Sequence, residues 1–493
     1  MDRRALDRSL AYVDSWLAWR CPREPLPGCV VAVTLRGRVL LSGAYGHADL
    51  GTGRRLGAND VFRVASHSKS FTAAALLQLV ERGRLGLDDP VADHLGWLAD
   101  HRDRRWRDVS VRQLLCHGAG IVRDGLDSEF WQLGRPFPDR DQLRAEVLDA
   151  ELVLEPDVAM KYSNFGYGLA GAVIEEVTGR SYHEQVSESV LAPLGLASIT
   201  PEPAPGEPGV TGHGRRRPDG SRPTIPAVDT RALAPATGFA SDAVDLCRWF
   251  TALVPGSRKV LGDPAKREMQ RVHWRVERPG PGGDEDYGLG LELIRVGDRK
   301  LFGHGGGFPG QITKTLADPA EGLVVTALTN GCDGPASEIA RGVLHVIDHF
   351  QAGAAGATPA RSRSLRRLEG RYVNLWSVAD VVAHRGGLSV GTPDSWKPFA
   401  DAERLEPLDP TTLRITETSS FGSEGETVRF RLGDAEVDTV SWAGMTMWPE
   451  ARWPAAERRL LGARRRRAPA PGGTGPGSAT SVAGEVPECR TRG

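Results

Sequence analysis

Strand-like segments lie at both ends of the first 350 residues of this chain, and helical patterns fill the residues between them. Near the start, Cys29–Leu41 predicts a hairpin with its turn at Arg36-Gly37. Further strands are predicted at Tyr287–Val296, Lys300–His304, Gln311–Ala317 and Leu323–Leu328, before a helix at Ala336–Phe350. We therefore predict an α/β (α+β) fold in which distant parts of the chain close one antiparallel sheet covered by helices.

The remaining residues predict a second, smaller domain. Residues 353–366 are rich in Ala, Gly, Pro and Ser, which is typical of a linker. Residues 367–452 show short strands, turns and four tryptophans, and this pattern predicts a small all-β barrel. Residues 453–493 are rich in Arg, Pro and Gly and are predicted to be disordered. Residues 1–352 then form the first domain.

The charge balance argues against several classes of partner. Lys and Arg number 62 against 63 Asp and Glu, so neither a nucleic acid nor a membrane surface is an expected partner. The start of the chain, Met1–Leu6, leads into no apolar core, so no secretory signal is predicted. Six scattered cysteines also favour a reducing, cytoplasmic location. No His, Cys and Asp cluster has metal-ligand spacing, so we expect neither a metal nor another cofactor.

The segment Ser66-His67-Ser68-Lys69 places a hydroxyl and an amine three residues apart, just before the apolar helical run Phe71–Val80. On a helix, positions i and i+3 share one face, so the Lys69 amine can reach the Ser66 oxygen. A serine hydroxyl is a poor nucleophile at neutral pH and needs such a neighbouring base. Ser-x-x-Lys is a nucleophile–base pair of acyl-transfer enzymes, although the motif alone is short enough to occur by chance.

Two further motifs supply the context. Tyr162-Ser163-Asn164 precedes a helix of small residues, and His304-Gly305-Gly306 ends a predicted strand. Residues 305–310 also satisfy G-x-G-x-x-G, but Pro309 and a strand follow them in place of a helix, so a dinucleotide site is rejected.

With these motifs, the chain resembles the serine β-lactamase and penicillin-binding-protein superfamily, and most of all its class C-like branch. The resemblance covers roughly residues 8–350 and includes Leu85–Val91, Val109–Gly120, Glu155–Gly168, Thr237–Asp245 and Gly303–Gly310. It implies a β-lactamase/transpeptidase-like fold and a metal-free reaction through an acyl-enzyme.

The resemblance also implies roles for individual residues. Ser66 would be the acylated nucleophile, and Lys69 would be its base, with an amine pKa lowered by burial and neighbouring charge. Tyr162 would relay the proton to the leaving group, and Asn164 would bind the substrate amide or fix Lys69. The backbone N–H groups of Ser66 and Gly307 would form the oxyanion hole.

His304 marks the main departure from the superfamily. Its members classically carry Lys-Thr-Gly where this chain has His304-Gly305-Gly306, whose two glycines would bind substrate by close backbone approach. A neutral histidine is a poor substitute for a lysine that reads a substrate carboxylate, so we expect weak β-lactamase and D-Ala-D-Ala carboxypeptidase activity. His304 would act in the catalytic site or serve as a plain structural residue, and the sequence leaves both open.

The C-terminal segments Leu368–Tyr372 and Gly425–Phe430 resemble the lipocalin-like domain of some esterases, D-stereospecific peptidases and thioesterases. We therefore expect a serine acyl hydrolase or acyl transferase that acts on an ester, a thioester or a D-configured peptide.

Two alternatives stay open. The first is a stand-alone nonribosomal-peptide cyclase, in which the tryptophan-rich β domain would form a roof over Ser66. The second, from another class, is an acyl-binding sensor or carrier-docking module without turnover. The expected partners are a small-molecule or peptide acyl substrate and, for some of these functions, a carrier protein; the oligomeric state is left open.

Overall fold

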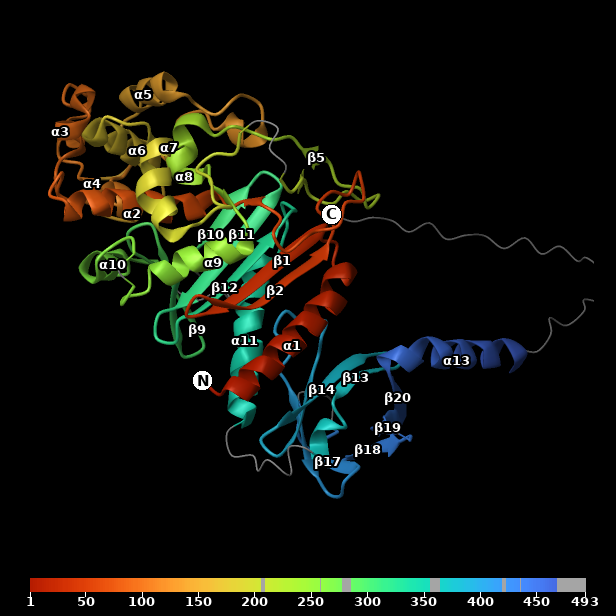
Figure 1. Ribbon diagram of the computed structural model, residues 1–493. Coiled ribbons are helices and arrows are strands. Elements are labelled where there is room, and N and C mark those ends of the chain that lie inside the picture. Colours follow the sequence, from red (N-terminus) through yellow and green to blue (C-terminus); the bar gives the residue numbers. More distant parts are fainter. Residues whose placement is uncertain are drawn as a thin grey trace, which may run out of the picture.

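An eight-stranded antiparallel sheet forms the centre of the first domain, in the order β2-β1-β12-β11-β10-β9-β8-β7 (Figure 1). The computed structural model describes residues 1–204, 209–257, 259–276, 285–354, 364–418, 423–434 and 436–467. The strands are β1 (Gly28–Leu35), β2 (Arg38–Gly46), β7 (Trp274–Val276), β8 (Glu285–Tyr287), β9 (Glu292–Val296), β10 (Arg299–Phe308), β11 (Gln311–Asp318) and β12 (Leu323–Thr329). Because β1 pairs with β12, distant parts of the chain close the sheet, which confirms the prediction.

Two strands differ from their predicted extents. The predicted strand Tyr287–Val296 is divided into β8 and β9, with Gly290 in the left-handed region at a φ of 68°. A Cβ at Gly290 would lie 2.7 Å from the carbonyl oxygen of Lys69, so the chain turns here against the helix that carries Lys69. Strand β10 runs past the predicted end at His304 to Phe308, because its glycines keep pairing with β11.

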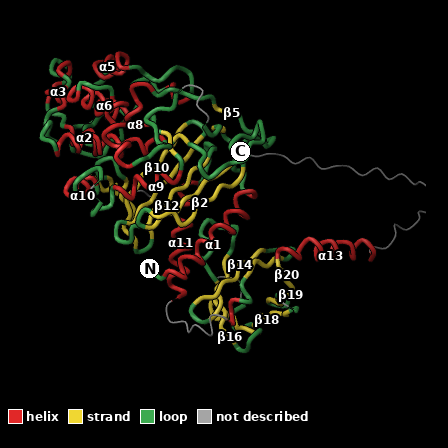
Figure 2. Tube along the Cα trace, in the orientation of Figure 1, coloured by secondary structure: helices red, strands yellow, loops and turns green. Residues whose placement is uncertain are grey.

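Helices cover both faces of the sheet (Figure 2). On one face lie α2 (Ser68–Glu81) and α9 (Ala243–Ala252), whose buried residues share one apolar cluster with Val30 and Ala32 of β1. On the other face lie α1 (Arg3–Arg20) and α11 (Ala336–Ala354), which share a second cluster with the alternate residues Val31 and Val33. This alternation is what a strand buried on both faces produces.

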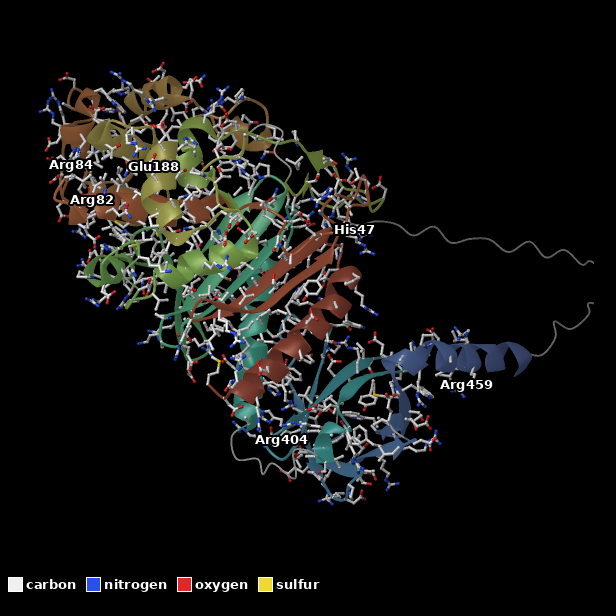
Figure 3. The ribbon with its side chains drawn as sticks, in the orientation of Figure 1. His47, Arg82, Arg84, Glu188, Arg404 and Arg459 are labelled. Carbon is white, nitrogen blue, oxygen red and sulfur yellow. The ribbon has the colours of Figure 1, made fainter. Side chains whose placement is uncertain are left out.

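The remaining helices of the first domain extend the layer around α2. They are α3 (Val91–His94), α4 (Val111–Cys116), α5 (Arg140–Asp149), α6 (Asn164–Thr178), α7 (Tyr182–Val186), α8 (Ala234–Thr237) and α10 (Asp263–Met269). Two short strand pairs, β3 (Phe62–Arg63) with β6 (Ala240–Ser241) and β4 (Gly212–His213) with β5 (Thr224–Ile225), complete the first domain. Arg82 and Arg84, just past the end of α2, lie at the outer edge of this layer (Figure 3).

The second domain contains a closed barrel of eight antiparallel strands, as predicted. They are β13 (Gly370–Val373), β14 (Val378–His384), β15 (Gly387–Gly391), β16 (Glu403–Pro407), β17 (Thr412–Glu417), β18 (Thr427–Leu432), β19 (Val437–Trp442) and β20 (Met445–Pro449).

The barrel packs on α1 and α11 (Figure 1). The Trp16 indole donates a hydrogen bond to the Pro393 carbonyl at 3.0 Å, and the rings of His349 and Phe399 stack at 4.3 Å. The barrel therefore lies on the face of the sheet opposite to α2. The expectation that this domain forms a roof over Ser66 is therefore wrong, because the barrel packs on the apolar sides of α1 and α11 instead.

After the barrel, a 3₁₀ turn at Glu450–Arg452 leads into α13 (Trp453–Arg467), where Trp453 contacts Trp448 with ring centroids 5.8 Å apart. The predicted disorder is therefore wrong for residues 453–467, which are rich in good helix formers. Residues 468–493, and residues 355–363 of the predicted linker, lie outside the described residues. Among the described helices, none is both long enough and apolar enough to cross a membrane.

Candidate active site

Ser66 lies in a 3₁₀ turn, Ala65–His67, that runs directly into α2. Its predecessor Ala65 has a φ of 49°, in the left-handed region that costs an L-residue about 1 kcal/mol. The turn leaves Ser66 partly exposed, whereas Ser68 and Ser70 are buried and donate their hydroxyls to backbone carbonyls. Ser66 is thus the accessible hydroxyl of this segment.

The Lys69 amine makes three polar contacts in a fully buried position. Its Nζ lies 3.2 Å from the Ser66 oxygen, as the i,i+3 spacing predicted. It also donates to Oδ1 of Asn164 at 2.7 Å and to the carbonyl of Ala236 at 2.8 Å. Burial lowers the pKa of this amine well below its ordinary value, while the negative charge of Asp124 opposes the shift.

Tyr162 supplies the second contact to the nucleophile, with its hydroxyl 2.9 Å from the Ser66 oxygen. Burial raises the pKa of this phenol well above its ordinary value, although the hydrogen bond with Ser66 opposes the shift, so Tyr162 is protonated at neutral pH. It directly precedes Ser163, which caps α6 by accepting the Gly166 N–H at 2.9 Å.

Asn164 is the first residue of α6, and its side chain is fixed from both ends. Its Oδ1 accepts from Lys69, and its Nδ2 donates to Oδ1 of Asp124 at 2.7 Å. Asp124 itself forms an ion pair with the exposed Arg123 at 3.0 Å. No pattern in the sequence points to Asp124, because it lies in a loop that carries no motif.

Strand β10 forms the opposite wall. It pairs with β9 only from Arg299 to Gly303, whereas its pairing with β11 continues to Phe308. The described structure therefore gives residues 304–308 no strand partner on the β9 side. A Cβ at Gly306 would lie 2.2 Å from the carbonyl oxygen of Val64, so only glycine lets this strand approach the Ser66 segment so closely.

Gly307, the second predicted oxyanion donor, is exposed and follows Gly306 on the same edge. Gly305 is partly exposed on the same strand. The predicted substrate-binding glycines and the predicted nucleophile thus lie on adjacent segments.

His304 is buried and hydrogen-bonded at both ring nitrogens. Its Nε2 lies 3.1 Å from the Tyr287 hydroxyl, and its Nδ1 lies 2.6 Å from the carbonyl oxygen of Gly305. Burial lowers the pKa of His304 to about 4, against the opposing charge of Glu292, so the ring is neutral at neutral pH. Glu292 in turn pairs with Lys314; burial opposes its ionisation, but Lys314 holds its pKa well below the ordinary value. The nearby lysine therefore carries its own counter-charge.

Two aromatic residues complete the group, and neither was predicted from the sequence to have a role. His117 lies with its ring centroid 4.2 Å from that of Tyr162, and Tyr287 bonds with His304. His117 falls within the Val109–Gly120 stretch of the resemblance, which was the signal available in the sequence. Among the described residues, no group of three or more His, Cys, Asp or Glu side chains could hold a metal ion.

A cavity of about 890 Å³ lies at the end of β10. Phe308, which follows Gly307, and Arg63, which is three residues before Ser66, both border it. Much of its wall is apolar and includes Ile225 and Val228. The Arg63 guanidinium pairs with Glu202 and stacks 4.5 Å from the Phe308 ring centroid, so its charge is compensated.

Comparisons with known proteins identify a family and several similar proteins. Residues 20–346 match the family model described as Beta-lactamase. Protein flp of Staphylococcus aureus (strain MW2) is 28% identical over 197 residues, which are 40% of this chain and 39% of flp. The D-aminopeptidase of Brucella anthropi is 28% identical over 333 residues, which are 65% of this chain and 59% of that protein. The chain therefore spans about two to three fifths of the length of these curated relatives.

Solved structures are also similar over most of the chain. A D-stereospecific amidohydrolase from Streptomyces superposes with a TM-score of 0.57 at 26% identity. The superposition covers 73% of this chain and 100% of that chain.

Proposed function

The chain belongs to the β-lactamase family of serine hydrolases, and from that premise we propose that it hydrolyses amides or esters of D-configured amino acids through a Ser66 acyl-enzyme. The observation that carries the proposal is the convergence of the Lys69 amine and the Tyr162 hydroxyl on one partly exposed serine oxygen. A nucleophile, a base and an acid within hydrogen-bond reach are what acyl transfer needs.

In the proposed reaction, the Ser66 oxygen attacks the substrate carbonyl carbon while its proton moves to the Lys69 Nζ. The carbonyl oxygen gains negative charge between the N–H groups of Ser66 and Gly307, which stabilise it. The carbonyl–leaving-group bond then breaks, the leaving group takes the Tyr162 proton, and Lys69 returns a proton to Tyr162. Water releases the acid by the reverse sequence.

Two features support the substrate class. His304 is neutral, and the nearby Lys314 is paired with Glu292, so neither offers a free cation to a substrate carboxylate. An amide or ester without that carboxylate therefore suits the site better than a penicillin or a D-Ala-D-Ala terminus. The D configuration rests on the similarity to a D-aminopeptidase and a D-stereospecific amidohydrolase.

The unpaired edge of β10 and the cavity beyond it support a binding mode in which the acyl group of the substrate extends along the strand. An extended acyl group can add along residues 304–308 by backbone hydrogen bonds. Its far end then reaches Phe308 and the cavity of about 890 Å³, whose volume suits a bulky uncharged group.

The test combines labelling with stereochemistry. A fluorophosphonate probe is expected to label the wild-type protein and Ser68→Ala but not Ser66→Ala. D-Phenylalanine amide is expected to turn over at least about tenfold faster than the L-enantiomer, a difference of about 1.4 kcal/mol in the transition state. Labelling that persists in Ser66→Ala contradicts the nucleophile, whereas equal rates for both enantiomers contradict only the stereochemical part.

A further inference from the structure

Tyr162 lies in a segment without regular secondary structure, immediately before α6. Its hydroxyl must nevertheless stay within hydrogen-bond reach of Ser66 to move a proton. Loop backbone is mobile unless other contacts fix it, so the residues that hold this segment matter for the reaction.

His117 holds the segment on both sides of Tyr162. Its carbonyl oxygen accepts the N–H of Lys161 at 2.8 Å, and its ring Nδ1 accepts the N–H of Ser163 at 3.1 Å. The imidazole also lies against the Tyr162 phenol, with centroids 4.2 Å apart and planes tilted by 38°. One residue thus contacts the backbone before Tyr162, the backbone after it, and its ring.

The placement of His117 is itself unusual. It follows α4 with a φ of 63°, in the left-handed conformation that Gly, and sometimes Asn, usually provides at a helix end. Its side chain is 2% exposed, and in the described structure its Nε2 has no hydrogen-bond partner. An unpaired buried polar atom costs about 1–3 kcal/mol. A helix end that needed only a cap would be served better by Asn or Gly, so the imidazole has another use.

The hydrogen bond with Ser163 also fixes the state of the ring. An accepting Nδ1 carries a lone pair, so His117 is neutral and its proton is on Nε2. Burial lowers the pKa of His117 well below its ordinary value, which agrees with this assignment.

We propose that His117 is a positioning residue for the reaction: it clamps the backbone on both sides of Tyr162 and supports the phenol ring, so that the hydroxyl stays beside the Ser66 oxygen. The proposal rests on the proton-transfer role given to Tyr162 above.

Two variants separate the hydrogen bond with Ser163 from the ring contact with Tyr162. His117→Asn keeps an acceptor near the Nδ1 position and suits the left-handed backbone, but it removes the ring. His117→Phe keeps a ring and removes the acceptor. We expect His117→Phe to lower kcat about 10- to 100-fold with little change in KM, since misplacement by about 1 Å can cost 10²-fold. His117→Asn is expected to restore at least about a third of the wild-type kcat.

His101 is the matched control. It is also 2% exposed, and its Nδ1 also accepts a backbone N–H, that of Asp103 at 3.0 Å. Its Nε2 bonds with the Val147 carbonyl, and none of its described contacts involves Ser66, Lys69 or Tyr162. His101→Phe is expected to lower the unfolding temperature but to keep the wild-type kcat.

A double-mutant cycle decides whether His117 acts through Tyr162. If it does, His117→Phe combined with Tyr162→Phe is no slower than Tyr162→Phe alone. Losses that multiply, or a wild-type kcat in His117→Phe, overturn the proposal. If circular dichroism shows that His117→Phe is unfolded, His117→Gly, which suits the positive φ, replaces it in the cycle. Absence of serine labelling in the wild-type protein contradicts the proposed function instead, so the two failures are distinguishable.

Discussion

Oδ1 of Asn164 lies 2.7 Å from Nζ of Lys69, and this contact decides which way the Lys69 lone pair points. A neutral amine has two N–H groups and one lone pair. The N–H groups are directed to Asn164 and to the Ala236 carbonyl, so the remaining direction, toward the Ser66 oxygen at 3.2 Å, belongs to the lone pair. Asn164 therefore makes Lys69 a proton acceptor for Ser66.

The first prediction concerns the acid–base pair. Lys69→Ala and Tyr162→Phe are each expected to lower kcat about 10²- to 10⁴-fold, the range for positioned acid–base groups. Steady-state kinetics with D-phenylalanine amide measures the loss, and circular dichroism checks the fold. A near-normal rate in either variant would assign the proton transfer to another group.

The second prediction concerns pH. The negative charge of Asp124 raises the Lys69 pKa, against the larger lowering by burial. Asp124→Asn removes that charge but keeps an oxygen for Asn164, so the Lys69 pKa falls further. Because Lys69 must be neutral to accept a proton, the acid limb of kcat/KM is expected to move to lower pH.

Arg123→Gln tests the same pKa by shifting it in the opposite direction. The positive charge of Arg123 lowers the Lys69 pKa, so its removal is expected to move the acid limb to higher pH. If the acid limb moves in the same direction in both variants, or in neither, it reports the titration of a group other than Lys69.

The third prediction concerns the lack of a free cation at His304 and Lys314 to bind a substrate carboxylate. Nitrocefin hydrolysis is expected to be weak compared with ester hydrolysis, since His304 is neutral and Lys314 is paired. In Glu292→Gln the Lys314 ammonium loses its counter-charge, and nitrocefin turnover is expected to rise relative to ester turnover. Efficient nitrocefin turnover by the wild-type protein would mean that another cation reads the carboxylate.

The fourth prediction concerns the cavity at the end of β10. Val228→Trp narrows it, so kcat/KM for p-nitrophenyl octanoate is expected to fall about tenfold, within the range of differential binding in an apolar pocket. The rate with p-nitrophenyl acetate should hardly change, because a short acyl group does not reach the cavity. Equal losses with both esters would place the acyl group elsewhere.

The fifth prediction concerns the barrel. A Cβ on Gly342 of α11 would lie 2.1 Å from the carbonyl oxygen of Trp396 and 2.9 Å from the Trp16 ring. Gly342→Ala is therefore expected to lower the unfolding temperature, although alanine favours a helix over glycine by about 1 kcal/mol. Activity per folded molecule should remain, because the barrel lies on the face opposite to Ser66. Gly96→Ala, with no atom within 4 Å of the new Cβ, is the control.

The sequence was sufficient where local spacing determines the geometry. The i,i+3 pair Ser66–Lys69 and the alternating strands needed only periodicity. The place of Tyr162 beside Ser66 followed from the resemblance to the superfamily, not from spacing. Asp124 and His117 were missed because their neighbours depend on how loops fold against α6. The position of the barrel was missed for a different reason. The apolar sides of α1 and α11 predict that these helices are covered, but the sequence does not identify the element that covers them.

The closure of the sheet by the two ends of the first domain has a consequence during synthesis. Strand β1 emerges from the ribosome early, but it can pair with β12 only when nearly the whole domain has been made. Such sequence-distant pairing forms slowly. The wall that faces Ser66 is formed by β10, which is also made late. A nascent or truncated chain can therefore contain Ser66 and Lys69 but lack the strand that would bind a substrate. A chain that ends before the glycines of β10 is therefore expected to lack hydrolytic activity, although it already carries Ser66 and Lys69.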